Sequence, residues 1–158
     1  MEIRFAAAQD VMGILELLRQ IGQVHHEGRP EIFRANAQKY GASQVLALLN
    51  SSKTPLFVAV EDEKVLGYCF CKVKAYENES VVNDHTELYI DDLCIHEDCR
   101  RQGIGTALYK EVMRYAKMRG CYNVTLNVWS FNEGALKFYE SLGMKPQRVF
   151  METILEEA

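Results

Sequence analysis

The spacing of apolar residues predicts a chain that alternates between strands and helices. The opening EIRFA has the composition of a short strand. The apolar residues after it recur every three or four positions, as on one face of a helix: Val11, Ile14, Leu15, Leu18 and Ile21. From Gly22 to Tyr40 the periodicity is lost, and Gly28 and Pro30 indicate a loop. A second helix is expected from about Ser43 to Leu49.

The rest of the chain continues this alternation. PLFVAV and VLGYCFCKVKAYE, joined by the polar EDEK, predict a hairpin, and a further strand is expected from about Thr86 to Ile95. A helix follows from about Gly103 to Arg119, and then a half-buried strand at NVTLNVW. A short helix from about Asn132 to Leu142 and a last strand at RVFMETIL complete the order, which predicts a mixed α/β domain.

The strand expected at Thr86–Ile95 contains an irregularity in the stretch YIDDLCI. Its apolar residues change from even to odd positions: Leu88 and Ile90, then Leu93 and Ile95. The change falls at Asp91 and Asp92. A one-residue β-bulge there would reset the inward face and bend the strand away from its neighbour. We therefore expect both acids to lie in a cleft, and pairing with the following strand to stop at this point.

Composition narrows the class of protein. With 158 residues, 48% hydrophobic and 25% charged, the chain is expected to form one domain over residues 1–158. It has no run of about 18 apolar residues and no basic, apolar leader, so we expect a cytoplasmic protein with no membrane association. A net charge of −4 argues against a nucleic-acid partner and suits a cationic small substrate slightly better.

Cysteines and histidines give no sign of a metal site. The five cysteines form no Cys-x-x-Cys pair and are expected to be free thiols. Cys99 lies beside two arginines, so a reactive thiol is the alternative there, but an ordinary thiol is preferred. His25, His26 and Glu27 invite a metal interpretation. Adjacent histidines in an extended loop point in different directions and no third ligand is identifiable, so we expect no metal. A solvated loop is preferred for these residues over a substrate-contacting rim.

The stretch HEDCRRQGIG, between a strand and a helix, has the composition of an anion-binding loop. Gly103 and Gly105 would let backbone N–H groups converge on a phosphate, which the helix dipole also favours. No Lys-Ser/Thr follows the glycines, which excludes a nucleoside-triphosphate P-loop, and the full Gly-x-Gly-x-x-Gly dinucleotide pattern is absent. Glycines that only permit a tight turn are the alternative.

Two motifs resemble the GCN5-related N-acetyltransferase (GNAT) family. Arg100-x-x-Gly103-x-Gly105 is similar to the family's coenzyme A pyrophosphate loop. The later helix resembles the family's Asn-x-x-Ala-x-x-Phe-Tyr-x-x-x-Gly pattern without a mismatch: Asn132, Ala135, Phe138, Tyr139 and Gly143. The resemblance implies a GNAT-type α/β fold, with a mixed, mostly antiparallel central sheet, splayed fourth and fifth strands and about four flanking helices.

The resemblance also implies acetyl-CoA as co-substrate, held between the splayed strands. It assigns the acetyl and pantetheine groups to the backbone of Leu93, Cys94 and Ile95. It assigns the pyrophosphate to N–H groups of the loop: Arg100, Arg101, Gln102, Gly103, Ile104, Gly105 and Thr106. In the helix motif with Ala135 and Phe138, Asn132 would contact the pantetheine arm and Tyr139 would protonate the departing thiolate. The alternatives are Asn132 as a helix cap, Tyr139 as core, and Arg100 and above all Arg101 as solvated cations.

We therefore predict an N-acetyltransferase that moves an acetyl group directly to a primary amine of a small molecule or peptide. A lysine-like amine has a pKa of about 10.4, so a base should help remove its proton. Asp91 is the preferred base or amine-orienting residue, with Asp92 and Glu87 as lesser candidates. Two alternatives stay open: a coenzyme A-binding module without catalysis, and a transferase of a longer acyl group. The resemblance also allows a homodimer.

Overall fold

The computed structural model describes residues 1–156. Its strands are β1 (Glu2–Phe5), β2 (Leu56–Glu61), β3 (Lys64–Tyr76), β4 (His85–Ile95) and β5 (Asn123–Leu126). Its helices are α1 (Val11–Gly28), α2 (Ala42–Leu49), α3 (Ile104–Met118) and α4 (Glu133–Ser141), with 3-10 turns at Ala8–Asp10 and Glu97–Cys99. Over the described residues, no helix has the length and apolar character needed to cross a membrane.

The chain divides into two compact units, Met1–Asn127 and a smaller one that begins at Val128. The first unit contains a sheet in the order β1-β2-β3-β4-β5, antiparallel throughout except for the parallel pair β4–β5. The second unit contains α4. A mixed, mostly antiparallel sheet accompanied by helices confirms the predicted α/β class, whereas a single domain over the whole chain stays a prediction.

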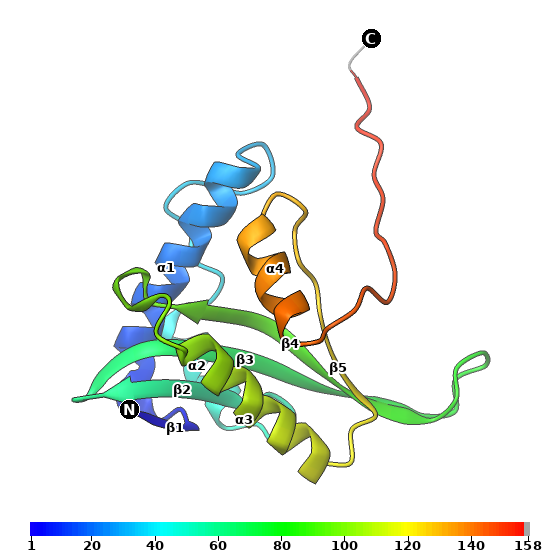
Figure 1. The fold of residues 1–158 in the computed structure, drawn as a ribbon, viewed down its shortest axis with the longest axis horizontal. Coiled ribbons are helices and arrows are strands. Elements are labelled where there is room, and N and C mark those ends of the chain that lie inside the picture. The colour runs from blue at the N-terminus through cyan, green and yellow to red at the C-terminus, as the bar shows by residue number, and fades with distance from the viewer. Residues whose placement is uncertain (157–158) are drawn as a thin grey trace. The chain divides into compact units, whose positions relative to one another are not determined.

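Two helices cover opposite faces of this sheet (Figure 1). Tyr68 and Cys94 are neighbours across β3 and β4 and belong to the core that α1 forms. The next pair along these strands is Gly67 and Ile95. Successive positions of a strand alternate between the two faces of the sheet, so this pair lies on the face opposite to α1. A Cβ at Gly67 would lie 2.7 Å from Ile95 and 3.2 Å from Leu108 of α3, so α3 packs closely on that face.

The predicted β-bulge is present in β4. Phe70 of β3 pairs with Asp92 and the next residue of β3 pairs with Ile90, which leaves Asp91 as the extra residue. Ile90 and Leu93 therefore lie on the same face of the sheet although they are three positions apart. The change of parity read from YIDDLCI is confirmed, and it falls at the acid pair.

Pairing between β4 and β5 ends at the same place. The parallel ladder runs from Glu87 opposite Asn123 to Ile90 opposite Leu126 and stops one residue before the bulge. Beyond Ile90, β4 continues to pair with β3 but has no partner in β5. The end of the pairing between the fourth and fifth strands at the bulge is therefore confirmed, whereas their splaying beyond Asp91 stays a prediction, because β5 itself ends at Leu126.

The loop predicted from Gly22 begins later than expected. Helix α1 continues to Gly28, so His25 and His26 lie in its last turn and not in an extended loop. A Cβ at Gly22 would lie only 2.3 Å from the carbonyl oxygen of Ala37. Gly22 therefore lies within the helix, at a point where another segment of backbone approaches closely. In the sequence, a glycine of this kind looks the same as a glycine that ends a helix.

The last predicted strand, at RVFMETIL, is wrong. Residues 144–156 contain no helix or strand, and Figure 1 shows them as a coil coloured orange to red. Val149 is 75% exposed and Phe150 is fully exposed. An alternating apolar pattern forms a strand only when a neighbouring strand accepts its backbone hydrogen bonds, and the sheet of the described residues draws none of its five strands from this segment.

Candidate active site

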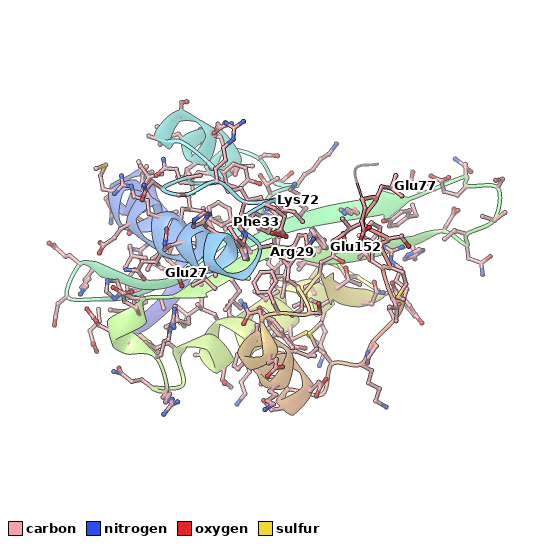
Figure 2. All side chains as sticks on the ribbon, turned by 90° about the horizontal axis from the view of Figure 1, so that it is seen from above. Glu27, Arg29, Phe33, Lys72, Glu77 and Glu152 are labelled. Atoms are coloured by element: carbon pink, nitrogen blue, oxygen red, sulfur yellow. The ribbon has the colours of Figure 1, made fainter. Side chains whose placement is uncertain are left out.

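The bulge residue Asp91 is held by three side chains from other parts of the first unit. The Tyr40 hydroxyl donates to its Oδ2 at 2.7 Å, and the Lys39 Nζ lies 3.0 Å from the same oxygen. Lys72, which extends from β3 (Figure 2), places its Nζ 3.7 Å from Oδ1. Burial alone would raise the pKa of Asp91, but these hydrogen bonds and charges lower it below its ordinary value. Asp91 is therefore a persistent carboxylate that binds ammonium groups.

The next residue, Asp92, has a different environment. It is opposite Phe70 on the face that α1 covers, and the Tyr68 hydroxyl donates to its Oδ2 at 2.7 Å. Burial raises the pKa of Asp92 to about 6, although Tyr68 and the charge of Lys39 act in the other direction, and the neighbouring Asp91 adds to the increase. A carboxylate with a pKa near neutrality can both take up and release a proton.

Glu87, the third acid considered as a base, lies outside this cluster. It is at the first position of the β4–β5 ladder, on the paired side of the bulge, and accepts a hydrogen bond from the Tyr76 hydroxyl at 3.2 Å. The two aspartates therefore lie just beyond the end of the β4–β5 ladder, whereas Glu87 lies within it.

The 29–41 segment brings Lys39 and Tyr40 to the acids. It lies against α1 at Gly22, as described above, and the Tyr40 ring packs on Phe70 with the ring centroids 5.3 Å apart. At the end of α1, His25 stacks on Phe33 with centroids 4.9 Å apart (Phe33 is labelled in Figure 2). Burial, aided by the charge of Lys39, lowers the pKa of His25 and favours its neutral form. This histidine therefore serves to hold the 29–41 segment.

The neighbouring His26 also contacts Phe33, because its Nδ1 lies 2.8 Å from the Phe33 carbonyl oxygen. Within residues 1–156, no group of three or more His, Cys, Asp and Glu side chains is arranged to hold a metal ion.

The loop after β4 is attached to α1 by a buried histidine. The Nε2 of His96 lies 3.2 Å from Glu16 of α1, and its Nδ1 accepts a hydrogen bond from the Asp98 N–H at 3.1 Å. This second contact caps the short 3-10 turn Glu97–Cys99. The start of the following 100–106 loop is thereby fixed relative to the sheet.

The 100–106 loop ends in a helix start that has no side-chain cap. Arg101 has a φ of 64° and Gly103 a φ of 78°, the left-handed region that is unusual for a residue other than glycine. Helix α3 begins after Gly103, which has no side chain to cap it. The N–H groups of its first turn, from Ile104 to Thr106, are left to bind a ligand, and the helix dipole favours an anion there. The arrangement fits the predicted pyrophosphate site.

The residues predicted to hold the acetyl and pantetheine groups lie just beyond the bulge. Leu93 and Cys94 pair with β3 but have no partner in β5, so no strand of the described sheet takes up the hydrogen bonds on that side of their backbone. The Cys94 thiol points into the core, where its Sγ lies 3.6 Å from the Leu17 carbonyl oxygen. Burial raises the pKa of Cys94 to about 12, so it is an inert thiol at neutral pH.

The predicted motif helix is α4, in the second unit. The Asn132 Oδ1 accepts a hydrogen bond from the Ala135 N–H at 3.2 Å, so its interpretation as a helix cap is confirmed. The Phe138 and Tyr139 rings meet edge to face, with centroids 5.2 Å apart. Gly143, with a φ of 94°, follows the end of the helix. The roles of Asn132 and Tyr139 toward the coenzyme stay predictions.

Four side chains around the acids were absent from the sequence-based site: Lys39, Tyr40, Tyr68 and Lys72. The first two lie in the segment read as a loop, and the other two in the predicted hairpin. The alternation of Tyr68 and Phe70 shows that they share a face of β3, but only the strand register places that face opposite Asp92.

The chain resembles known acetyltransferases in sequence. Residues 16–144 match the acetyltransferase (GNAT) family. The chain is 32% identical over 105 residues to the probable N-acetyltransferase camello of Xenopus laevis, covering 66% of this chain and 45% of that protein. It is 32% identical over 87 residues to N-alpha-acetyltransferase 30 of Schizosaccharomyces pombe, covering 55% of each. The chain thus spans about half the length of these curated relatives.

The fold is shared with solved structures over almost the whole chain. A mutant of the BH1408 protein from Bacillus halodurans is 31% identical, with a TM-score of 0.94 over 99% of this chain and 100% of that one. An aminoglycoside acetyltransferase from a soil metagenomic sample, solved with sisomicin, is 23% identical and has a TM-score of 0.73 over 98% of this chain and 96% of that one, a likeness of fold alone. The chain belongs to the acetyltransferase (GNAT) family.

Proposed function

We propose that this chain is an acetyl-CoA-dependent N-acetyltransferase that moves an acetyl group directly to a primary amine of a small molecule or peptide. The observation that carries the proposal is the end of the β4–β5 ladder at Ile90, directly before two acids of unlike environment. The uncapped start of α3 and the membership of the family support it. The predicted cytoplasmic location and homodimer belong to the same proposal.

When bound, acetyl-CoA supplies an activated acetyl thioester. The backbone of Leu93 to Ile95 would hold the acetyl and pantetheine groups, and the N–H groups of the 100–106 loop would hold the pyrophosphate. Asn132, whose Oδ1 caps α4, would contact the pantetheine arm through its amide N–H, with Ala135 and Phe138 in the same motif. Tyr139 would donate a proton to the thiolate, because a phenol hydroxyl can protonate or stabilise such an anion.

We assign the two aspartates different roles. Asp92 accepts the proton of the acceptor amine, because a pKa of about 6 leaves it mostly ionised at pH 7 yet basic enough to act. Asp91 orients the amine, because its low pKa makes it a weak base, and its contacts with Lys39 and Lys72 are those of a carboxylate that attracts ammonium groups. This assignment reverses the preference drawn from the sequence.

Direct transfer needs no nucleophile from the enzyme. Cys94, the cysteine in this stretch of backbone, is buried, and its pKa of about 12 leaves almost no thiolate at neutral pH. This supports attack by the acceptor amine itself and argues against an acetyl-cysteine intermediate.

The acceptor class is tested by the release of free coenzyme A thiol. The purified chain is incubated with acetyl-CoA and, in turn, a polyamine, an aminoglycoside, an amino acid, and peptides with a free N-terminus or a lysine. Aminoglycosides and peptide N-termini are the acceptors that the names of the similar proteins suggest. Thiol release with at least one of these amines is expected.

Two controls separate the alternatives. The first uses longer acyl thioesters of coenzyme A in place of acetyl-CoA. If one of them releases coenzyme A thiol faster than acetyl-CoA does, the transferred group is that longer acyl group. A rise in Tm with acetyl-CoA but no thiol release with any amine would identify a coenzyme A-binding module without catalysis.

A further inference from the structure

The candidate acceptor position already holds a primary amine. Lys39 places its Nζ 3.0 Å from Asp91 Oδ2, the oxygen that also accepts the hydrogen bond from Tyr40. Its side chain is 46% exposed, whereas the carboxylate that it contacts is only 7% exposed. The ammonium group thus enters the cluster from the solvent side, as a substrate amine would.

We propose that Lys39 is an internal acetyl acceptor, which takes the acetyl group when no external amine is present. The inference rests on the proposed function, because it uses the same donor and the same acids. Lys39 first gives a proton to Asp92, and its nitrogen then attacks the thioester carbonyl. The new C–N bond forms as the C–S bond breaks, and the second proton lost from nitrogen balances the proton that the thiolate takes up. The products are an Nε-acetyl group on Lys39 and free coenzyme A thiol.

The other lysine at Asp91 is less suited to this reaction. The Lys72 Nζ is 3.7 Å from Asp91 Oδ1, beyond hydrogen-bond distance, and it extends from the middle of the paired strand β3. Lys39 is instead in the 29–41 segment, directly before α2, where it contacts Asp91, and its charge acts on Asp92 as well. The lysine in hydrogen-bond contact is therefore expected to react, and Lys72 is its matched control.

Acetylation would change the charge of the site. An acetylated Lys39 no longer carries the positive charge that pairs with Asp91, whereas Lys72 and Tyr40 remain. An external amine and the Lys39 ammonium group compete for the same carboxylate oxygen. External acceptors are therefore expected to protect Lys39 from acetylation.

The main experiment omits the acceptor. The full chain is incubated with acetyl-CoA, and acetylation of each lysine is followed by peptide mass spectrometry, with the exposed Lys110 of α3 as the measure of uncatalysed background. Lys39 is expected to react at least about tenfold faster than Lys110, since a positioned amine gains from proximity. The rate constant should be independent of protein concentration, as for a reaction within one chain.

Variants define the reacting group. Lys39→Arg should abolish acetylation at position 39 while it keeps a cation beside Asp91. The same change at an exposed lysine of α3, Lys117→Arg, should leave the acetylation of Lys39 in place. Asp92→Asn should slow it. Thermal unfolding of each variant checks that it folds. Reaction of Lys39 at the Lys110 rate, or in proportion to protein concentration, would overturn the proposal.

A second readout needs no turnover. In protein with isotope-labelled lysine and no acetyl-CoA, the NMR signal of the Lys39 side chain, identified by its loss in Lys39→Arg, should shift when an acceptor amine that releases thiol is added. An unchanged signal at saturating amine contradicts a shared position. Thiol release with external amines but no labelling of Lys39 sinks this inference alone, whereas no reaction with any amine sinks the proposed function.

Discussion

The two segments that border the candidate active site are built in different ways. The 100–106 loop offers backbone N–H groups at the start of α3, and its shape is set by the left-handed φ of Arg101 and Gly103. The 29–41 segment offers side chains, and Tyr40 reaches a carboxylate 51 residues further along the chain. The first segment is made of neighbours in sequence, and the second depends on partners that only the folded sheet provides.

The two segments are therefore expected to bind different substrates, the first the coenzyme and the second the acceptor. A pyrophosphate is the same in every coenzyme A molecule, so a short backbone motif suffices to bind it. An acceptor is chosen by side chains whose positions depend on register and loop packing. Changes near the 100–106 loop and α4 should therefore act on the coenzyme, and changes near the 29–41 segment and the acids should act on the acceptor.

The largest effect is expected when Asp92 loses its ability to take a proton. Asp92→Asn should lower kcat by about 10²- to 10⁴-fold, the usual contribution of a general base. The Asn Oδ1 can still accept the hydrogen bond that Tyr68 gives to Asp92. Asp91→Asn should instead raise the KM for the amine more than it lowers kcat.

Steady-state thiol release with both substrates varied separates the two variants. Acetyl-CoA binding, measured by the shift in Tm, should survive both changes. A greater loss of kcat in Asp91→Asn than in Asp92→Asn would restore the ranking drawn from the sequence.

What could be predicted from the sequence follows the same division. The bulge and the end of the β4–β5 ladder were predictable, because the change of parity across Asp91 and Asp92 can be read from consecutive residues. The contacts of Lys39 and Tyr40 with Asp91 were not predictable, because no local sequence pattern indicates which strand a loop will pack against. The strand predicted at 148–155 failed for a related reason, since its pattern requires a neighbour that the sequence does not specify.

On the coenzyme side, Tyr139→Phe removes the proposed proton donor and keeps the ring. A loss of kcat of about 10²-fold is expected, with acetyl-CoA binding unchanged, because only the departure of the thiolate is affected. Thiol release is measured at saturating concentrations of both substrates. A rate within about twofold of the parent would remove Tyr139 from the mechanism.

The two acids should also differ in how they make stability depend on pH. The pKa of Asp92 rises from an ordinary 3.8 to about 6 in the folded chain. The folded state therefore binds more protons between pH 4 and 6, and the stability due to Asp92 falls as the pH rises through this range. For Asp91, whose pKa is lowered, the sign is opposite, and its stabilisation is lost as the pH falls below 3.8.

Urea unfolding of the parent and of Asp92→Asn at pH 4 and pH 7 measures the first effect. The free energy of unfolding of Asp92→Asn relative to the parent should increase by about 2 to 3 kcal/mol from pH 4 to pH 7. The variant that loses the most activity would thus compare better with the parent in stability at pH 7 than at pH 4. A difference between the two proteins that does not change with pH would contradict a raised pKa for Asp92.

The smallest effects are expected from a matched pair of glycine substitutions. A Cβ at Gly103 meets no atom within 4 Å, so Gly103→Ala acts through the left-handed φ of 78° alone, at a cost of about 1 to 2 kcal/mol. Gly22→Ala has an ordinary helical backbone but places its Cβ 2.3 Å from the Ala37 carbonyl oxygen, which must move.

Gly103→Ala should raise the KM for acetyl-CoA by about tenfold, and Gly22→Ala should raise the KM for the amine by a similar factor, each with little effect on the other substrate. Gly120→Ala, just past the other end of α3, also has a left-handed φ (74°) and no atom within 4 Å of its Cβ, and is the control. If both variants raise the same KM, the two segments do not serve separate substrates.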